Sequence, residues 1–218
     1  MEAASVTRRD AASGRLSGEE PTQSVTERGW KIADPGPLGL AAFALTTFVL
    51  SMYNAGVMHN PKGEPIVFGL ALAYGGLAQL LAGMWEFRTG NTFGAVAFTS
   101  YGAFWLSFWA FVQFYEKTVP ASAAAPAVGL YLVAWGIFTT YMLVASLRTT
   151  GAIALVFLLL AATYFLLGIG NWTTTSSVVK AGGWVGIATA AAAWYASFAA
   201  VTNATFGRTV MPVRPLTR

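Results

Sequence analysis

The sequence contains no cysteine and a single histidine, His59. Without cysteine the chain has no disulfide, no thiol nucleophile and no thiolate ligand for a metal. One histidine also excludes sites that need several imidazole rings, and His59 lies in a polar segment where we expect it to be solvated. The apolar segments hold neither paired carboxylates nor a nucleophile beside a base. We therefore expect no catalytic residue, no metal site and no cofactor, and the chain is not predicted to be an enzyme.

Charged residues are scarce as well. They make up 10% of the 218 residues and hydrophobic residues 56%, whereas soluble proteins carry about a quarter charged residues. One soluble core cannot bury this much apolar surface without leaving large exposed patches, so lipid is the natural solvent. The net charge of +4 does not indicate a nucleic-acid partner, because the basic residues lie in short segments beside apolar runs.

Residues 1–33 differ from the rest of the chain. They are rich in serine, threonine, arginine and glutamate and show no apolar periodicity. A secretory signal would need an apolar run of about 7–15 residues, which this segment lacks. We predict a disordered cytoplasmic tail. The tail is also the basis of an alternative function, a membrane-bound carboxylate sensor. Deleting the tail should abolish the output of a sensor and leave the flux of a transporter unchanged.

From residue 35 onward, apolar segments alternate with short polar breaks. Each segment is close to the roughly 20 residues with which a helix crosses a bilayer. The unbroken apolar runs do not alternate as the strands of an outer-membrane barrel would. The sequence therefore predicts an all-α membrane protein, with a six-helix transport domain over 34–212 and a short cytoplasmic C-terminal tail over 213–218. The expected helices are 37–57, 66–85, 92–115, 126–147, 150–170 and 179–202.

The basic residues indicate how these helices are oriented. If the N-terminus lies inside, only Lys62, Lys117 and Lys180 of the 13 lysines and arginines fall in outside loops. Cytoplasmic loops typically carry the excess of lysine and arginine. The chain is therefore predicted to span the cell membrane several times, with both termini in the cytoplasm.

One acidic residue, Glu86, stands at the edge of a predicted helix, and none stands at mid-membrane. A charge at the bilayer centre usually marks an ion pathway or a proton relay. Its absence favours an anion or a neutral acid that passes hydroxyls, amides and aromatic edges. Gln79, Gly83 and Glu86 share one helix face. Two interpretations of Glu86 remain open: a gate or proton-linked group at the cytoplasmic mouth, or an interfacial carboxylate paired with Arg88.

Short motifs run through the chain from Asp34 to Pro212. They lie at 35–40, 46–47, 54, 74–76, 79, 82–83, 86–87, 90–93, 97–98, 100–106, 131–132, 135–136, 168–171, 181–184 and 206–210. Together they resemble the acetate uptake transporter family, the succinate/acetate permeases, and 86–105 is the most specific stretch. The chain departs from the family at Asp34, where asparagine usually precedes the proline. A carboxylate is tolerated at a helix N-terminus, so we expect a modest effect.

The resemblance implies a pore within each protomer, a homohexamer in membrane lipid, and transport of acetate and often succinate by a proton-linked permease or an anion channel. It also implies a pore constriction at Phe43, Tyr101 and Leu160. These residues lie on the first, third and fifth predicted helices, which the topology makes parallel. A bare carboxylate would lose its hydration there. It could cross as the neutral acid, or the Tyr101 hydroxyl could replace part of the hydration shell.

Two helix faces of equal spacing extend from this constriction. They are Phe43, Thr47, Leu50 and Asn54 on the first helix, and Leu160, Tyr164, Leu167 and Asn171 on the fifth. We interpret Leu50 and Leu167 as packing residues. For the two amides, packing and an outer vestibule whose N–H groups bind a carboxylate remain equally open. The predicted substrate path consists of Thr47, Asn54, Gln79, Glu86 and Asn171.

Overall fold

The computed structural model describes residues 32–216. The chain divides into two units, Met1–Ile32 and Ala33–Arg218. The helices given below, from residues 32–216, belong to the second unit. The disordered tail predicted over 1–33 thus lies outside the described residues apart from its last two, and it stays a prediction. Residues 217–218 of the predicted C-terminal tail also lie outside them.

Six helical spans within residues 32–216 are long and apolar enough to cross a membrane, which confirms the predicted fold class. Two of the spans are built from several helical pieces. In chain order the elements are α1 (Gly36–Asn54); η1 (Pro61–Gly63), α2 (Ile66–Leu72), η2 (Ala73–Ala78) and α3 (Gln79–Thr89); α4 (Thr92–Ala110), η3 (Phe111–Tyr115) and η4 (Glu116–Thr118); α5 (Ala121–Ser146); α6 (Gly151–Trp172); and α7 (Ser176–Phe206).

Several predicted helix ends are wrong. The second span runs on to Thr89 instead of ending at 85, because the first residue with a left-handed backbone is Gly90, with φ of 81°. This extra turn carries Glu86 into the helix. The fourth span starts at Ala121 rather than 126, so Pro126 lies in its second turn. A proline there costs one backbone hydrogen bond without ending the helix.

The ends of the first and last spans also differ from the prediction. α1 stops at Asn54 instead of 57, two residues before Gly56, whose φ is +75°. α7 covers Ser176–Phe206 instead of 179–202. Asn203 lies within the extra turn of this helix, and its side chain bonds the segment that follows.

Two stretches of π-helix interrupt the second and third spans, η2 and η3. π-helical turns are rare and often stand at functional sites. Within η2, a Cβ on Gly75 would lie 2.6 Å from the Thr46 hydroxyl of α1, and a Cβ on Gly76 would lie 2.7 Å from Leu106 of α4. The two glycines therefore let the second span approach both α1 and α4 closely.

Glycines also bring α7 against α1 and α6, where Gly182 and Gly186 form a G-x-x-x-G motif of the kind that lets helices pack closely in lipid. A Cβ on Gly182 would lie 2.8 Å from the Leu167 side chain of α6. A Cβ on Gly186 would collide with the Ser51 hydroxyl of α1, and one on Gly183 would collide with the backbone at Ala55. These contacts hold the three helices at backbone distance from one another.

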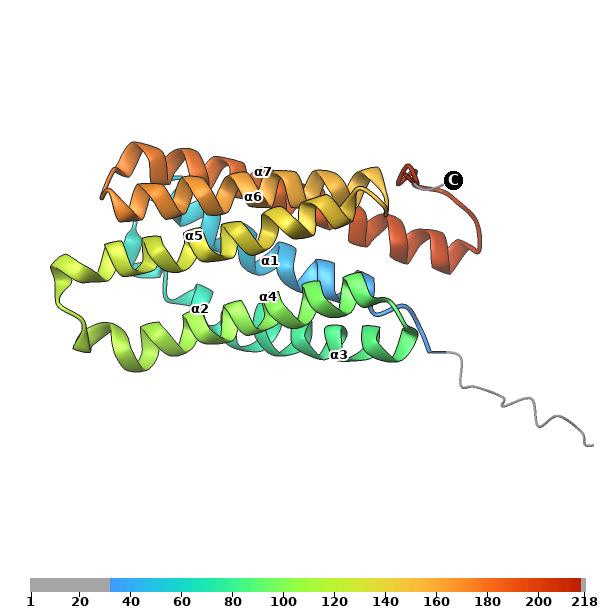
Figure 1. Ribbon diagram of the computed structural model, residues 1–218, viewed down its shortest axis with the longest axis horizontal. Coiled ribbons are helices and arrows are strands. Elements are labelled where there is room, and N and C mark those ends of the chain that lie inside the picture. The colour runs from blue at the N-terminus through green and yellow to red at the C-terminus, as the bar shows by residue number, and fades with distance from the viewer. Residues whose placement is uncertain (1–31, 217–218) are drawn as a thin grey trace, which may run out of the picture. The chain divides into compact units, whose positions relative to one another are not determined.

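Figure 1 shows α6 and α7 side by side, α3 and α4 side by side, and α1 between these two pairs. α1 begins and α7 ends at the same end of the bundle. There the segment after α7 folds back onto the bundle. The Asn203 side chain accepts hydrogen bonds from the backbone of Val210 and Met211, and Gly151 donates to the carbonyl of Arg214 over 2.7 Å. We call residues 207–216 the C-terminal strap.

Candidate functional site

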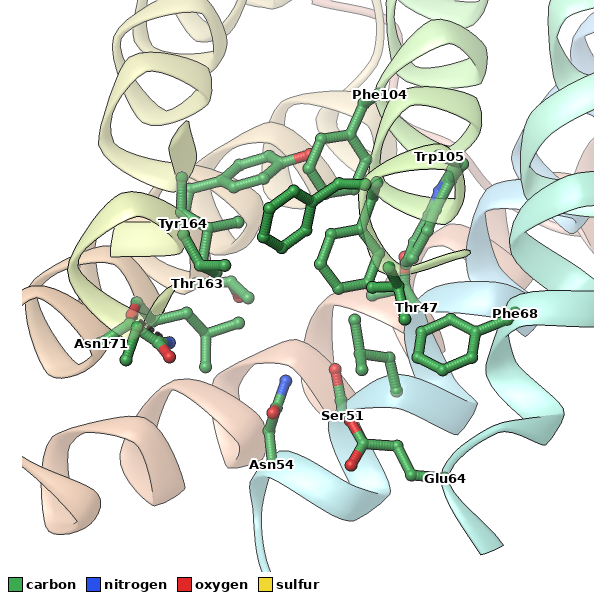
Figure 2. Close-up of a pocket in the computed structure, with 18 of the residues that line it drawn as sticks. Thr47, Ser51, Asn54, Glu64, Phe68, Phe104, Trp105, Thr163, Tyr164 and Asn171 are labelled. Atoms are coloured by element: carbon green, nitrogen blue, oxygen red, sulfur yellow. Dashed lines mark hydrogen bonds between the residues drawn. The ribbon is translucent and has the colours of Figure 1, made fainter. Parts of the chain in front are cut away.

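A cavity of about 540 Å³ opens between the C-terminal ends of α1 and α6 and the N-terminal end of α5 (Figure 2). We name it the Asn171 cavity. Of the predicted site residues, it is lined by Phe43, Thr47, Asn54, Leu160 and Asn171. The other residues that matter for its chemistry are Leu50, Ser51, Glu64, Phe104, Trp105, Glu116, Tyr164 and Leu167.

The structure thus brings together both helix faces that the sequence had picked out by their spacing. All eight residues of the two faces line the Asn171 cavity, including Leu50 and Leu167, which we had interpreted as packing residues. Leu167 also packs, since its side chain abuts Gly182. Helical periodicity is the reason for this outcome, because residues at i, i+4, i+7 and i+11 point the same way.

Thr47 presents an unused hydroxyl on this wall. Its side chain is 6% exposed, and Oγ1 has no hydrogen-bond partner among residues 32–216. The neighbouring Thr46 hydroxyl, in contrast, donates to the carbonyl of Ala42 at 3.0 Å. A buried hydroxyl without a partner costs free energy, so a ligand oxygen in the cavity could satisfy it. Asn171 donates one side-chain N–H to the carbonyl of Leu167 at 2.8 Å, which leaves its second N–H and its amide oxygen for a ligand.

Two carboxylates, Glu64 and Glu116, also line the Asn171 cavity, and sequence reasoning missed both. Figure 2 shows Glu64 at the same end as Asn54, with Ser51 beside it. Glu64 stands between two prolines, a pattern that reads as a loop, and Glu116 follows a helix that was expected to end at 115. Their negative charges make this wall unfavourable to anions of high charge.

Tyr101 is buried behind the Asn171 cavity and does not line it. Its ring centroid lies 5.9 Å from that of Phe43 and 6.4 Å from that of Tyr164. The Tyr101 hydroxyl lies 2.9 Å from Oγ1 of Thr139 on α5, and Thr139 donates its own proton to the carbonyl of Trp135. Tyr101 must therefore be the donor in the first bond. Its proton points to α5, which does not support the idea that this hydroxyl donates to the substrate.

A second cavity of about 340 Å³ opens at the other end of the bundle, where α1, α4 and α6 begin. We name it the Glu86 cavity. Its lining includes Asp34, Leu40, Glu86, Asn91, Phe93, Ala97, Thr149, Thr150, Phe157, Ala200, Asn203 and Val213. Val213 belongs to the C-terminal strap, so the strap forms part of the wall of this cavity.

Glu86 is 2% exposed and faces the protein interior. Its Oε2 accepts a hydrogen bond from Thr89 at 3.1 Å, and Oε1 has no hydrogen-bond partner among the described residues. Arg88 is exposed and is not hydrogen-bonded to either carboxylate oxygen. A buried carboxylate at the wall of a cavity fits the interpretation as a gate or proton-linked group better than that of a surface ion pair.

Two further predicted positions can be placed. Gln79 is 1% exposed and packs inside the bundle, and it lines neither of the cavities described above. Asp34 accepts a hydrogen bond from the backbone N–H of Gly36 at 2.8 Å, at the start of α1. This bond satisfies one of the free backbone N–H groups at the start of the helix and explains how a carboxylate fits the position. Within residues 32–216, no three histidine, cysteine, aspartate or glutamate side chains group to hold a metal ion.

Comparison with known proteins shows which family the chain belongs to. Residues 18–218 match the GPR1/FUN34/yaaH family. The chain belongs to that family. This match confirms the resemblance that the sequence motifs indicated. Relatives whose names refer to acetate and succinate support it further.

Three relatives illustrate the match. The succinate-acetate/proton symporter SatP of Escherichia coli K12 is 38% identical over 183 residues, which cover 84% of this chain and 96% of the relative. Acetate permease A of Emericella nidulans is 43% identical over 198 residues, which cover 84% of this chain and 66% of the relative. The fungal protein is thus substantially longer than the matched part. A solved structure of the bacterial acetate channel SatP aligns with a TM-score of 0.78 at 38% identity, covering 84% of this chain and 99% of that one.

Proposed function

We propose that this GPR1/FUN34/yaaH family member transports small carboxylates, acetate foremost and succinate second, across a membrane. The path runs from the Asn171 cavity past Phe43, Leu160 and Tyr101 to the Glu86 cavity. One observation carries this proposal: two cavities open at opposite ends of a six-span bundle and approach each other at the residues expected to form the constriction. The names of the similar proteins supply the substrate class.

The chemistry of the path supports a small monocarboxylate. The Thr47 hydroxyl and the amides of Asn54 and Asn171 offer hydrogen bonds to a carboxylate, and the aromatic barrier favours an apolar methyl group. We further propose that the protein assembles as a homohexamer with both termini in the cytoplasm. Transport by a channel and proton-linked transport both remain compatible with this path, and a buried Glu86 offers a proton-accepting group for the second.

Uptake of labelled acetate into proteoliposomes tests the proposal, with membrane potential and pH gradient imposed separately. We expect uptake above that of protein-free vesicles, driven by potential alone for a channel and by the pH gradient alone for neutral, proton-linked transport. Leu160→Trp is the control, because the indole ring is larger than the leucine side chain and should block the path at the constriction. Uptake should then return to the background set by diffusion of acetic acid through the lipid. Uptake by the parent protein equal to that background would contradict the proposed function.

The acidic wall predicts how the protein ranks its substrates. A dianion is repelled by Glu64 and Glu116 twice as strongly as a monoanion. The double variant Glu64→Gln/Glu116→Gln should therefore raise succinate uptake relative to acetate about fivefold, at a pH where succinate is a dianion, which corresponds to about 1 kcal/mol.

Charge should be the cause, so the gain is expected to shrink at high ionic strength. Lys117→Gln serves as the matched control, because it removes a neighbouring positive charge and should lower succinate uptake. An unchanged ratio of succinate to acetate uptake at low salt would show that the two carboxylates do not face the path.

A further inference from the structure

The two cavities meet along three helices without sharing a wall residue among those described. On α6, Leu160 lines the Asn171 cavity, and Phe157, three residues earlier, lines the Glu86 cavity. On α1, Phe43 lines the Asn171 cavity, and Leu40, three residues earlier, lines the Glu86 cavity. α1 and α6 thus pass from one cavity to the other within a single turn, about 4.5 Å of helix rise, and on α4 the change falls between Phe98 and Phe104.

Tyr101 occupies the space between the two cavities. Its ring centroid lies 5.9 Å from that of Phe43 on the Asn171 side and 6.1 Å from that of Phe157 on the Glu86 side. The barrier therefore has an aromatic ring on each cavity side of Tyr101. Phe43 and Leu160 form only the side toward the Asn171 cavity.

The ring of Phe157 is held in place from two directions. It is 5% exposed, and its centroid lies 5.1 Å from that of Phe93, which also lines the Glu86 cavity. Tilted aromatic pairs at this separation are favourable beyond the apolar area that they bury. Phe93 stands in the first turn of α4 and Phe157 in the second turn of α6, so the pair joins these two helices on the Glu86 side of the barrier.

We propose that Phe157, supported by Phe93, forms a second gate on the Glu86 side of Tyr101 and sets the size limit of the transported acid together with Phe43 and Leu160. The inference rests on the proposed transport function. A carboxylate that has passed Phe43 and Leu160 is still dehydrated when it reaches Tyr101 and Phe157. The two gates flank the same dehydrated stretch of the path, so each contributes to one barrier and widening either gate lowers that barrier.

The absence of native cysteine allows a direct test in the full chain. Single cysteines replace Leu160 or Phe157, and an impermeant thiosulfonate reagent is applied to each side of oriented membrane vesicles in turn. Ala125→Cys and Ala200→Cys mark the sides, since these small residues line the Asn171 and Glu86 cavities respectively. We expect Leu160→Cys to react from the Ala125 side and Phe157→Cys from the Ala200 side.

A transport measurement completes the test. Phe157→Ala should raise lactate flux relative to acetate about tenfold per assembled protein, because the shorter side chain leaves more room for the larger acid. A tenfold change corresponds to a decrease of about 1.4 kcal/mol in the activation free energy for lactate. Leu158→Ala is the matched control, since that side chain is exposed on the same helix and should leave the ratio unchanged.

The outcomes separate this inference from the proposed function. Labelling of Phe157→Cys from the Ala125 side, or from neither side, would overturn the second gate, and so would an unchanged lactate-to-acetate ratio in Phe157→Ala. If parent vesicles took up no acetate while the labelling pattern held, the transport proposal would fail and the position of the gate would stand.

Discussion

Shortening Phe43 and Leu160 together to alanine is expected to raise the flux of lactate relative to acetate about tenfold. Both side chains are buried and form the wall where the Asn171 cavity stops short of Tyr101. Alanine at both positions extends that cavity to the Tyr101 ring. The dehydrated part of the path is then wider, so a larger acid meets less steric hindrance there.

Tyr101→Phe is the matched comparison for this double variant. It keeps the ring and removes a hydroxyl that donates to Thr139, so the size limit should not change. Thr139→Val removes the same hydrogen bond from the α5 side and should have the same effect as Tyr101→Phe. A different effect of the two substitutions on acetate flux would show that the Tyr101 hydroxyl also acts on the substrate.

Large-to-small substitutions in a packed interior commonly cost about 2–5 kcal/mol. Fluxes of acetate, lactate and succinate therefore need to be expressed per assembled protein, measured by size-exclusion chromatography of the reconstituted sample. If the double variant assembles normally and ranks the three acids as the parent does, Phe43 and Leu160 are packing residues and the constriction lies elsewhere.

Replacing Gly183 by alanine is expected to remove most of the assembled protein. The new Cβ would collide with the backbone nitrogen of Ala55 and would lie 2.6 Å from the carbonyl carbon of Asn54. Backbone atoms cannot turn aside as the end of a long side chain can, so α7 has to move away from α1. Overpacking of this kind typically costs about 1–3 kcal/mol, and here it would also displace Asn54 from the wall of the Asn171 cavity.

Gly69→Ala is the control for this prediction. Apart from its own stretch of helix, no described atom lies within 4 Å of the position that its Cβ would occupy. Alanine also favours a helix over glycine by about 1 kcal/mol. The melting temperature in mild detergent should fall sharply for Gly183→Ala and stay level or rise for Gly69→Ala. Equal melting temperatures for the two variants would mean that α1 and α7 are not held at the observed distance.

The sequence was sufficient for the parts of the fold that depend on local pattern. Apolar runs of bilayer length predicted six spans, and helical spacing placed Thr47, Asn54 and Asn171 on faces that do line one cavity. The family resemblance supplied Phe43, Tyr101 and Leu160. The predictions made from apolar runs and helical spacing need only the neighbours of a residue along its own helix.

Other features depend on contacts between helices that no single segment encodes. Glu86 reads as an interfacial residue, yet one more turn of helix and the approach of α4 bury it. The Tyr101 hydroxyl seemed available to the substrate, but Thr139, which lies 38 positions away in the sequence, accepts its proton. Phe157 carries no motif at all. Only the position of Phe93 and of the Glu86 cavity makes it a candidate.

The C-terminal strap has a practical consequence for tracking this protein in cells. The Tyr195 hydroxyl donates a hydrogen bond to the carbonyl of Pro212, and the Asn203 amide donates one to the carbonyl of Met211. The backbone N–H of Leu216 donates to the carbonyl of Thr149. A fluorescent reporter joined directly after Phe206 would therefore remove part of a cavity wall and leave these polar groups without partners. A reporter joined beyond residue 216 through a flexible linker would keep the strap in place, so brightness and flux could be compared in the same molecule.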